Sequence, residues 1–335
     1  MASGFTVLWL QAGSCGGCTM SALAADDLGM VKALGRFGIR LLWHPSLSEE
    51  SGREAIAILD DVVAGRIALD CLCVEGSVLD GPDGTGRFQM LSGTGRAMKD
   101  WVAALAVKAR HVVAIGSCAT FGGLPAGGGN PTGARGLQYA GWDMGGALGK
   151  DFRSGSGLPV INISGCAPHP GWVVETLAAL SLGDFGPERL DALGRPRAIA
   201  DHLAHHGCSR NEFYEFKASA VRPSDRGCLM ENLGCRATQA PGDCNMRRWN
   251  GFGSCTDAGY TCINCTSPGF ESPPGPFQET AKVAGIPIGL PLDMPKAWFV
   301  ALAALSKSAT PQRVRTNAHA DHVLIPPARR PTKTP

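Results

Sequence analysis

The stretch Thr6–Met20, T-V-L-W-L-Q-A-G-S-C-G-G-C-T-M, begins as a short apolar run and ends in a glycine-rich turn with two cysteines. A helical pattern follows it, with Leu23, Leu28, Val31 and Leu34 recurring at three- to five-residue steps. Strand, glycine-rich turn and helix in this order are typical of the start of a doubly wound α/β domain.

The same alternation continues as far as Leu182. Further strands are expected at Ile39–Trp43, Leu69–Glu75, His111–Gly116 and Val160–Ser164. Helices are expected near Glu49–Ala64, Arg96–Arg110 and Trp172–Leu182. The pattern predicts a parallel sheet covered by helices on both faces, in a domain that spans residues 1–182.

Beyond Leu182 the alternation stops. Residues 183–290 lack an adequate apolar pattern and carry many cysteine and histidine residues, so we expect an irregular domain of loops and short helices held together by bound metal. Residues 291–335 form a third segment. It contains the apolar helical pattern K-A-W-F-V-A-L-A-A-L and then a Pro- and Arg-rich tail, expected either to be disordered or to dock a partner.

Composition narrows the classes of function. The 335 residues carry a formal charge of only +2, which argues against a nucleic-acid partner or a membrane surface. No apolar run approaches the roughly 20 residues that span a bilayer, so no membrane span is expected. The N-terminus has no charged leader or cleavage site, which predicts a cytoplasmic protein. In that compartment thiols stay reduced, so the 13 cysteines are better explained as ligands than as disulfides.

A first group of cysteines lies just beyond three predicted strands. Cys15 and Cys18 follow the first strand, Cys118 follows H-V-V-A-I-G, and Cys166 follows V-I-N-I-S. The carboxyl ends of parallel strands meet at one edge of the sheet, where such folds bind ligands. These four thiols can therefore converge on one metal centre.

Two cysteines and one carboxyl group nearby are interpreted differently. Cys71 and Cys73 lie two apart within a predicted strand and are expected to pack in the core. Glu75 ends that strand at the same edge. It is either a polar group beside the metal centre or a solvated carboxylate.

Two further groups lie in the irregular region. The second contains an H-x-x-C pair and C-L-M-E-N-L-G-C, and its members are His205, Cys208, Cys228 and Cys235, with His206 as a competing candidate. The third ends in C-I-N-C, and its members are Cys244, Cys255, Cys262 and Cys265. Zinc would accept either set. Three such sets in one chain favour iron–sulfur clusters, with zinc as the alternative.

Taken together and in order, these motifs resemble the small, electron-transferring subunit of nickel–iron hydrogenases. They are V-E-G-S, I-G-S-C-A-T-F-G-G, G-C-A-P-H-P-G-W, C-L-M-E-N-L-G-C and C-I-N-C-T-S-P-G-F, with the two spaced cysteines near the N-terminus. The resemblance implies a flavodoxin-like first domain, a second domain with two more clusters, and an obligatory large subunit that holds the nickel–iron centre. Respiratory-complex subunits share the first domain but lack the second.

The resemblance also implies a role for each ligand group. The proximal 4Fe–4S cluster would be held by Cys15, Cys18, Cys118 and Cys166. The distal 4Fe–4S cluster would be held by His205, Cys208, Cys228 and Cys235. The medial cluster would be held by Cys244, Cys262 and Cys265. No catalytic acid or base is expected on this chain.

Two departures from the family pattern are informative. Members with a 3Fe–4S medial cluster have proline where this chain has Cys255, so we expect Cys255 to be a fourth ligand and the medial cluster to be 4Fe–4S. Oxygen-tolerant membrane-bound members add two cysteines at the proximal site. The corresponding positions here are Gly17 and Gly123, which implies an ordinary proximal cluster.

Within the family, S-C-G-G-C-T-M and the expected location resemble the hydrogen-sensing regulatory branch. That branch implies signalling to a histidine kinase, with the C-terminal tail as a docking segment for the kinase or a second heterodimer. The alternative is a cytoplasmic uptake hydrogenase that feeds electrons to a respiratory acceptor. His319 and His322 in the tail are not expected to bind a metal.

Overall fold

The computed structural model of the chain describes residues 4–25, 29–272, 275–283, 286–287 and 290–321. Five parallel strands form its main sheet in the order β11-β7-β3-β1-β2. Their bounds are β1 Phe5–Gln11, β2 Ile39–Trp43, β3 Leu69–Glu75, β7 Ala109–Ile115 and β11 Ile161–Ile163. Numbered within the sheet, the order is 2-1-3-4-5, that of flavodoxin-like folds. The predicted fold class is confirmed.

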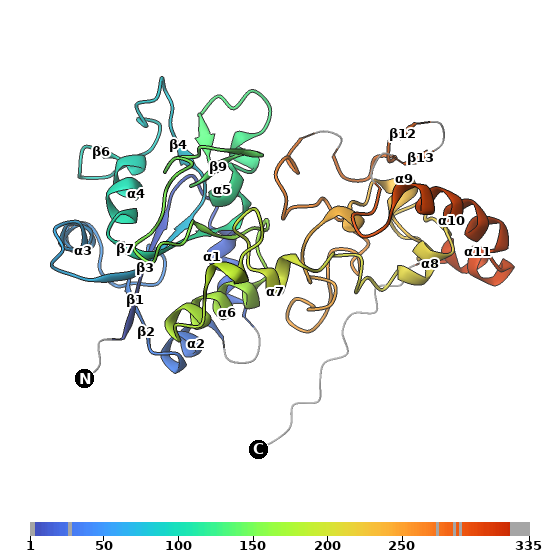
Figure 1. Ribbon diagram of the computed structural model, residues 1–335, viewed down its shortest axis with the longest axis horizontal. Helices are drawn as coiled ribbons and strands as arrows, with labels where there is room; N and C mark the ends of the chain where they lie inside the picture. Colours follow the sequence, from blue (N-terminus) through green and yellow to red (C-terminus); the bar gives the residue numbers. More distant parts are fainter. Residues whose placement is uncertain (1–3, 26–28, 273–274, 284–285, 288–289, 322–335) are drawn as a thin grey trace, which may run out of the picture. The chain divides into compact units, whose positions relative to one another are not determined.

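Helices cover both faces of this sheet (Figure 1). On one face, Leu8 and Leu72 pack with Leu59 of α3 and Leu105 of α4 in the main core. α1 and α2 contact α6 on the other face. The helix bounds are α1 Gly17–Leu23, α2 Met30–Arg36, α3 Arg53–Val63, α4 Met98–Ala106, α5 Gly116–Phe121, α6 Pro170–Ser181 and α7 Arg197–Ala200.

Short elements decorate the loops between these. Three small antiparallel pairs join β4 Val78–Leu79 to β8 Ala134–Arg135, β5 Met90–Leu91 to β6 Arg96–Ala97, and β9 Tyr139–Ala140 to β10 Asp143–Met144. The 3-10 turns are η1 Leu124–Ala126 and η2 Pro187–Arg189.

The helical pattern after the first turn forms two helices rather than one. α1 ends at Leu23, and α2 begins at Met30 after Gly29, whose φ is 70°. A backbone with positive φ does not continue a right-handed helix, and glycine adopts it without strain. Leu28 lies outside the described residues.

The chain divides into two compact units, and the boundary differs from the sequence-based one. Unit 1 is Met1–Asp201 with Cys265–Pro273, and unit 2 is His202–Asn264 with Pro274–Pro335. Residues 183–201 join unit 1 because Asn162 of β11 donates hydrogen bonds to the carbonyls of Leu193 (2.7 Å) and Gly194 (2.8 Å). These bonds involve main-chain carbonyls, which leave no apolar pattern in the sequence.

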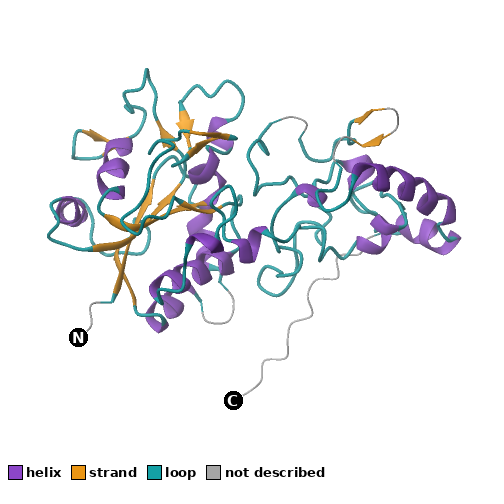
Figure 2. Ribbon diagram, viewed as in Figure 1, coloured by secondary structure: helices purple, strands orange, loops and turns teal. Residues whose placement is uncertain are grey.

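Unit 2 is mostly loop, as predicted (Figure 2). Its small core contains Leu229, Met230, Leu233 and Phe299. Its elements are α8 Asn211–Glu215, α9 Met230–Leu233, η3 Ala237–Gln239, β12 Lys282–Val283, β13 Ile286–Pro287, α10 Lys296–Ala309 and α11 Gln312–Ala318.

The described part of the C-terminal segment forms two helices, which differs from the expectation of a disordered tail. The apolar pattern forms α10, and α11 follows within the predicted tail. Val314 and Ala318 of α11 are buried against Ala218, with Phe213 and Phe216 beside them. His319 is exposed, and His322 lies outside the described residues. Within the described part of the chain, no helix combines the length and apolar character needed to cross a bilayer.

Candidate metal centres

The first ligand group lies at the carboxyl edge of the sheet in unit 1. Cys15 and Cys18 follow β1, Cys118 lies in the helix that follows β7, and Cys166 lies just beyond β11. Cys15 and Cys166 are exposed, whereas Cys18 and Cys118 are partly buried. All four cysteines therefore lie beyond the strands after which they were expected, with Cys18 and Cys118 in the first turns of helices.

Neighbouring thiols disfavour ionisation of Cys18, Cys118 and Cys166. The pKa of Cys18 is raised by burial, by the Glu75 carboxyl group, and then by Cys118, Cys15 and Cys166. Burial, followed by the nearby Cys166, raises the pKa of Cys118 to about 11. Burial also raises the pKa of Cys166, and Cys15 adds to the effect. Thiols that disfavour one another's ionised forms need a cation between them to ionise together.

Glycines leave room around these sulfur atoms. A Cβ on Gly116 would lie 2.5 Å from Cys18 Sγ, and one on Gly123 would lie 2.8 Å from Cys118 Sγ. Both glycines have positive φ, 85° and 54°. A Cβ on Gly17 would lie 3.2 Å from Cys15 Sγ. Side chains are thus excluded from the sulfur atoms, which suits a bulky inorganic cluster.

Glu75 is fully buried. This excludes the interpretation of Glu75 as a solvated carboxylate and leaves that of a polar group beside the metal centre. Glu75 ends β3 beside β1, where the strand order reverses and such folds place their ligand sites. Its carboxyl oxygens accept hydrogen bonds from Trp9 Nε1 (3.1 Å), Gln11 Nε2 (3.3 Å), Ser14 Oγ (2.9 Å), Cys18 N (3.2 Å), Thr19 N (3.3 Å) and Thr19 Oγ1. Glu75 therefore holds the turn that presents Cys15 and Cys18.

Cys71 and Cys73 are fully buried in β3, and their sulfur atoms lie 3.8 Å apart. The prediction that they pack in the core is confirmed.

The second ligand group meets around one cavity in unit 2, lined by His205, Cys208, Cys228 and Cys235. Burial and the neighbouring Cys235 raise the pKa of Cys228 to about 12. Burial raises the pKa of Cys235 to about 11, although the backbone N–H groups of Ala237 and Cys262 oppose this rise. Three cysteines and one histidine therefore line one cavity.

The hydrogen bonds distinguish His205 from its competitor His206. His206 accepts from the Leu203 N–H at Nδ1 (3.2 Å) and contacts Asp293 Oδ2 through Nε2 (3.0 Å). His205 contacts the same Asp293 oxygen through Nε2 (3.1 Å), while its Nδ1 is buried without a hydrogen-bond partner among the described residues. A ring nitrogen that is buried and unpaired, opposite one bonded to a carboxylate, is the arrangement of a metal-binding histidine.

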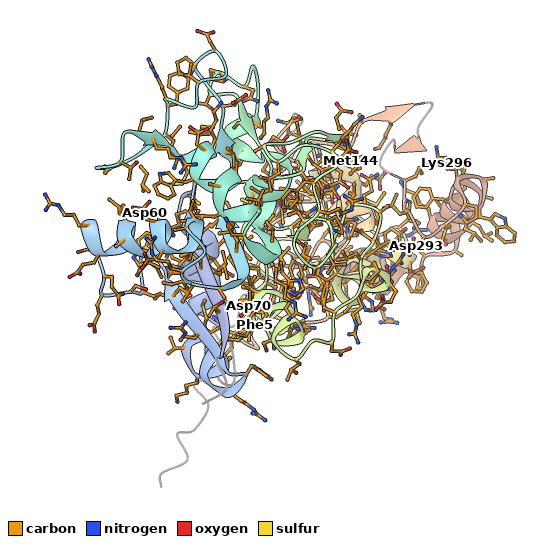
Figure 3. All side chains as sticks on the ribbon, turned by 60° about the vertical axis from the view of Figure 1, so that its left-hand side comes forward. Phe5, Asp60, Asp70, Met144, Asp293 and Lys296 are labelled. Carbon is orange, nitrogen blue, oxygen red and sulfur yellow. The ribbon has the colours of Figure 1, made fainter. Side chains whose placement is uncertain are left out.

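Asp293 was not identified from the sequence. It lies in the loop before α10, and Figure 3 labels it with Lys296. The ligand atoms of His205, His206 and Asp293 lie within 4.8 Å of one another, so they also meet the spacing of a single-ion site. That site would use Nε2 of His205 and leave its buried Nδ1 unpaired. The three thiols beside that ring favour the cluster arrangement.

A buried cation also lies beside this group. Arg210 is 3% exposed and donates to the carbonyls of Asp225 (2.5 Å), Gly227 (2.8 Å) and Thr256 (3.0 Å). Burial lowers its pKa, whereas the nearby thiols, Cys208 first, raise it. Arg210 follows Cys208 by two residues, and this spacing is the signal for it in the sequence. Because arginine side chains are usually exposed, the sequence did not predict that Arg210 lies buried beside the thiols.

The third ligand group is divided between the two units. Cys244, Cys255 and Cys262 belong to unit 2 and Cys265 to unit 1. The Cys262 N–H donates to Cys235 Sγ (3.3 Å), which links this loop to the second group. The Cys265 carbonyl accepts from Ser117 Oγ next to Cys118, so this end of the loop is fixed on unit 1. The grouping of these four cysteines stays a prediction.

Comparisons with known proteins match both parts of the chain. Residues 15–180 match the family described as NADH ubiquinone oxidoreductase, 20 Kd subunit. Residues 201–278 match the C-terminal region of NiFe/NiFeSe hydrogenase small subunits. The second match separates the hydrogenase interpretation from that of a respiratory-complex subunit.

Proteins that are similar over most of this chain are also hydrogenases by name. The small subunit of F420 non-reducing hydrogenase I from Methanosarcina mazei is 33% identical over 321 residues, 90% of this chain and 82% of that protein. The periplasmic [NiFeSe] hydrogenase small subunit of Desulfomicrobium baculatum is 30% identical over 287 residues, 81% of this chain and 86% of that one. An actinobacterial-type NiFe-hydrogenase structure from Ralstonia eutropha aligns with a TM-score of 0.73 at 29% identity, covering 91% of this chain and 90% of that one.

Glu75→Gln tests whether the buried carboxyl group holds the turn at Cys15 and Cys18. The substitution replaces one carboxyl oxygen, which accepts hydrogen bonds, with an NH2 group, which donates them. The buried groups that donated to that oxygen lose their acceptor, and each such loss costs about 1–3 kcal/mol. We expect substoichiometric iron at this site, read from the cluster's paramagnetic signal after reduction. The matched control is Asp70→Asn on the same strand. The Asp70 carboxyl group accepts only from Thr6 in the described structure, at the opposite end of β3 from Glu75 and from the turn that carries Cys15 and Cys18. Equal iron loss in both variants would contradict a specific role for Glu75.

Proposed function

This chain belongs to the family of nickel–iron hydrogenase small subunits, and on that premise we propose that it conducts electrons through three iron–sulfur clusters between a large subunit and an outside acceptor. The observation that carries the proposal is the pair of convergent ligand sets. Four cysteines lie beyond three parallel strands at the sheet edge of unit 1, and three cysteines with one histidine line a cavity in unit 2.

The residues of this chain hold and orient the clusters. Cys15, Cys18, Cys118 and Cys166 would hold the proximal cluster, while Glu75 fixes the turn that carries two of them. Bound clusters of this kind take up and release single electrons. Cys15 and Cys166 are exposed, which suits contact of this edge with the large subunit that holds nickel and iron.

At the other end, Cys208, Cys228, Cys235 and Nδ1 of His205 would hold the distal cluster. Imidazole donates less charge to iron than a thiolate, and the buried Arg210 guanidinium favours added negative charge. Both features raise the reduction potential of this set, so electrons released by hydrogen oxidation run toward it. Cys244, Cys255, Cys262 and Cys265 would hold the medial cluster.

Of the two roles, we propose catalytic hydrogen oxidation as the main one and hydrogen sensing as the alternative. The relatives above are described as hydrogenases by their names, and none of those names mentions sensing. The hydrogen-sensing role with a histidine kinase rests on S-C-G-G-C-T-M and on the expected cytoplasmic location, and it stays a prediction. The cytoplasmic location likewise stays a prediction.

Purification of the chain from its own host under mild conditions tests the function. We expect a nickel-containing large subunit to accompany it and to give rapid hydrogen-dependent reduction of benzyl viologen. A co-purifying histidine kinase with slow dye reduction would favour the sensor. Absence of any nickel-binding partner would contradict the proposal.

The fourth medial ligand is tested through Cys255. We expect the oxidised protein to lack a 3Fe–4S paramagnetic signal, and Cys255→Ala to produce one that integrates to nearly one spin per small subunit. Cys73→Ala, which removes a buried thiol that is no ligand, should produce none. A one-spin 3Fe–4S signal in the unaltered protein would rule out Cys255 as a ligand.

Asp293→Asn tests how the distal histidine is positioned. Asn keeps the shape but is a weaker acceptor for Nε2–H, so His205 donates less charge at Nδ1. We expect an upward shift of the distal midpoint potential on the order of tens of millivolts, since a tenfold change in relative affinity for the two redox states equals about 59 mV. His206→Gln keeps the His205–Asp293 bond and should shift it little. No shift in Asp293→Asn, by potentiometric titration with spectroscopic detection, would remove Asp293 from this role.

A further inference from the structure

Ser117 connects three segments of unit 1 that carry expected cluster ligands. It lies in α5 directly before Cys118 and is 1% exposed. Its Oγ donates to the Cys265 carbonyl and accepts from the Gly165 N–H (2.8 Å). Its own N–H donates to the carbonyl of Gly165 (2.9 Å), the residue directly before Cys166. One side chain therefore joins two proximal segments to the segment that begins at Cys265.

A hydroxyl group suits this position because it makes both side-chain hydrogen bonds at once. It has one donor and two acceptor lone pairs, so it donates to Cys265 while it accepts from Gly165. The methyl group of alanine would leave the Cys265 carbonyl and the Gly165 N–H without this partner. The contact between Ser117 and Cys265 spans 148 positions, so no local pattern marks it in the sequence.

The next residue, Thr266, is anchored separately. Its carbonyl accepts from Ser164 Oγ (2.8 Å) and from Arg195 Nη1 (3.1 Å). Arg195 is itself held by an ion pair with Asp191, in which Nη2 lies 2.7 Å from Oδ2 and both side chains are largely buried. Ser164 and Thr266 are 6% and 5% exposed. The consecutive carbonyls of Cys265 and Thr266 are thus both held by side chains of unit 1.

The chain returns to unit 1 at this anchored point. Residues 202–264 belong to unit 2, and Cys265 is the first residue of the segment that rejoins unit 1. Cys118 and Cys265 are both partly buried. The Ser117 hydroxyl therefore fixes an expected medial ligand, and it belongs to the residue adjoining an expected proximal ligand.

We propose that Ser117 is a positioning residue for electron transfer, whose hydroxyl fixes Cys265 against the proximal site and completes a bonded path from Cys118 to Cys265. The path runs from Cys118 through one peptide bond and the Ser117 side chain, and then across one hydrogen bond to the Cys265 carbonyl. Electron tunnelling weakens less steeply along covalent and hydrogen bonds than across an unbonded gap. Loss of the hydroxyl replaces the hydrogen bond with such a gap.

This proposal rests on the proposed function, which supplies the electrons. Hydrogen oxidation in the large subunit releases two electrons and two protons, and iron–sulfur clusters pass the electrons on singly. Each transfer that Ser117 serves oxidises the proximal set by one electron and reduces the medial set by one electron. No bond forms or breaks in this step, and no proton moves.

Ser117→Ala in the purified heterodimer tests the proposal by electron paramagnetic resonance of the fully reduced protein. Reduced 4Fe–4S clusters that lie close together split each other's signals, and the splitting depends on their separation and on the bonds between them. We expect Ser117→Ala to retain its iron and to show a smaller proximal–medial splitting. Unchanged splitting in the loaded variant would overturn the proposal.

Ser21→Ala is the matched control. Ser21 is buried and its Oγ donates to the Pro168 carbonyl (2.6 Å), so this variant also removes a buried serine–carbonyl hydrogen bond from unit 1. That bond does not involve the segment at Cys265, and we expect the splitting to stay unchanged. An equal decrease in both variants would show a general loosening of unit 1 and would contradict a specific role for Ser117.

Ser164→Ala provides a second variant in case Ser117→Ala does not fold or does not load its clusters. It removes one of the two side-chain donors to the Thr266 carbonyl and leaves the Ser117 bond to Cys265 in place. We expect a decrease in splitting that is smaller than that of Ser117→Ala. If Ser117→Ala lacks clusters, a decrease in Ser164→Ala supports the proposal, and an unchanged splitting overturns it.

Kinetic measurements separate this proposal from the proposed function. Exchange of hydrogen with deuterium from the solvent needs only the nickel–iron centre, whereas reduction of benzyl viologen also needs the electron path. We expect Ser117→Ala to keep the exchange rate and to lose viologen reduction severalfold, in kcat rather than in KM for hydrogen. Loss of both rates would contradict an electron-transfer role. Absence of viologen reduction by the unaltered heterodimer would instead contradict the proposed function, while the splitting in the chemically reduced protein would still test Ser117.

Discussion

The cost of ionising buried thiols that lie near one another is the constraint on which both ligand sets depend. Burial and neighbouring sulfur atoms raise the pKa of Cys18, Cys118, Cys228 and Cys235. Such groups ionise together only when a metal centre offsets their charge. Unit 2 shows the consequence most clearly, because its apolar core is small and its backbone is mostly loop. We infer that metal binding supplies much of its folding free energy.

Unit 1 handles the same constraint with a rigid scaffold. Parallel strands bring three loops to one edge, so the cysteines need not be neighbours in sequence. Glu75 then adds a buried carboxyl group beside the thiols, which is electrostatically unfavourable for Cys18 ionisation. Its hydrogen bonds to the turn explain its place there. Glu75 therefore fixes the turn that carries Cys15 and Cys18, although its carboxyl group disfavours the ionised form of the Cys18 thiol.

The sequence predicted the parts that depend on local pattern. The bounds of β2 and β3 agree to the residue, because apolar strands between polar turns are easy to delimit. The candidate cysteines of unit 1 were placed for the same reason, since each lies beyond a strand, and their role as ligands stays a prediction. What the sequence concealed depends on contacts between distant residues. Asp293 lies 88 positions from His205, and residues 183–201 join unit 1 through main-chain carbonyls. Neither leaves a periodic signal.

The central claim is that the chain holds three iron–sulfur clusters in the ligand sets described. Iron, acid-labile sulfide and zinc, measured on the purified heterodimer and normalised to the small subunit, test it most directly. Three four-iron clusters predict about twelve iron and about twelve sulfide per small subunit, beyond the iron of the large subunit, with little zinc. Stoichiometric zinc with little labile sulfide would contradict the account.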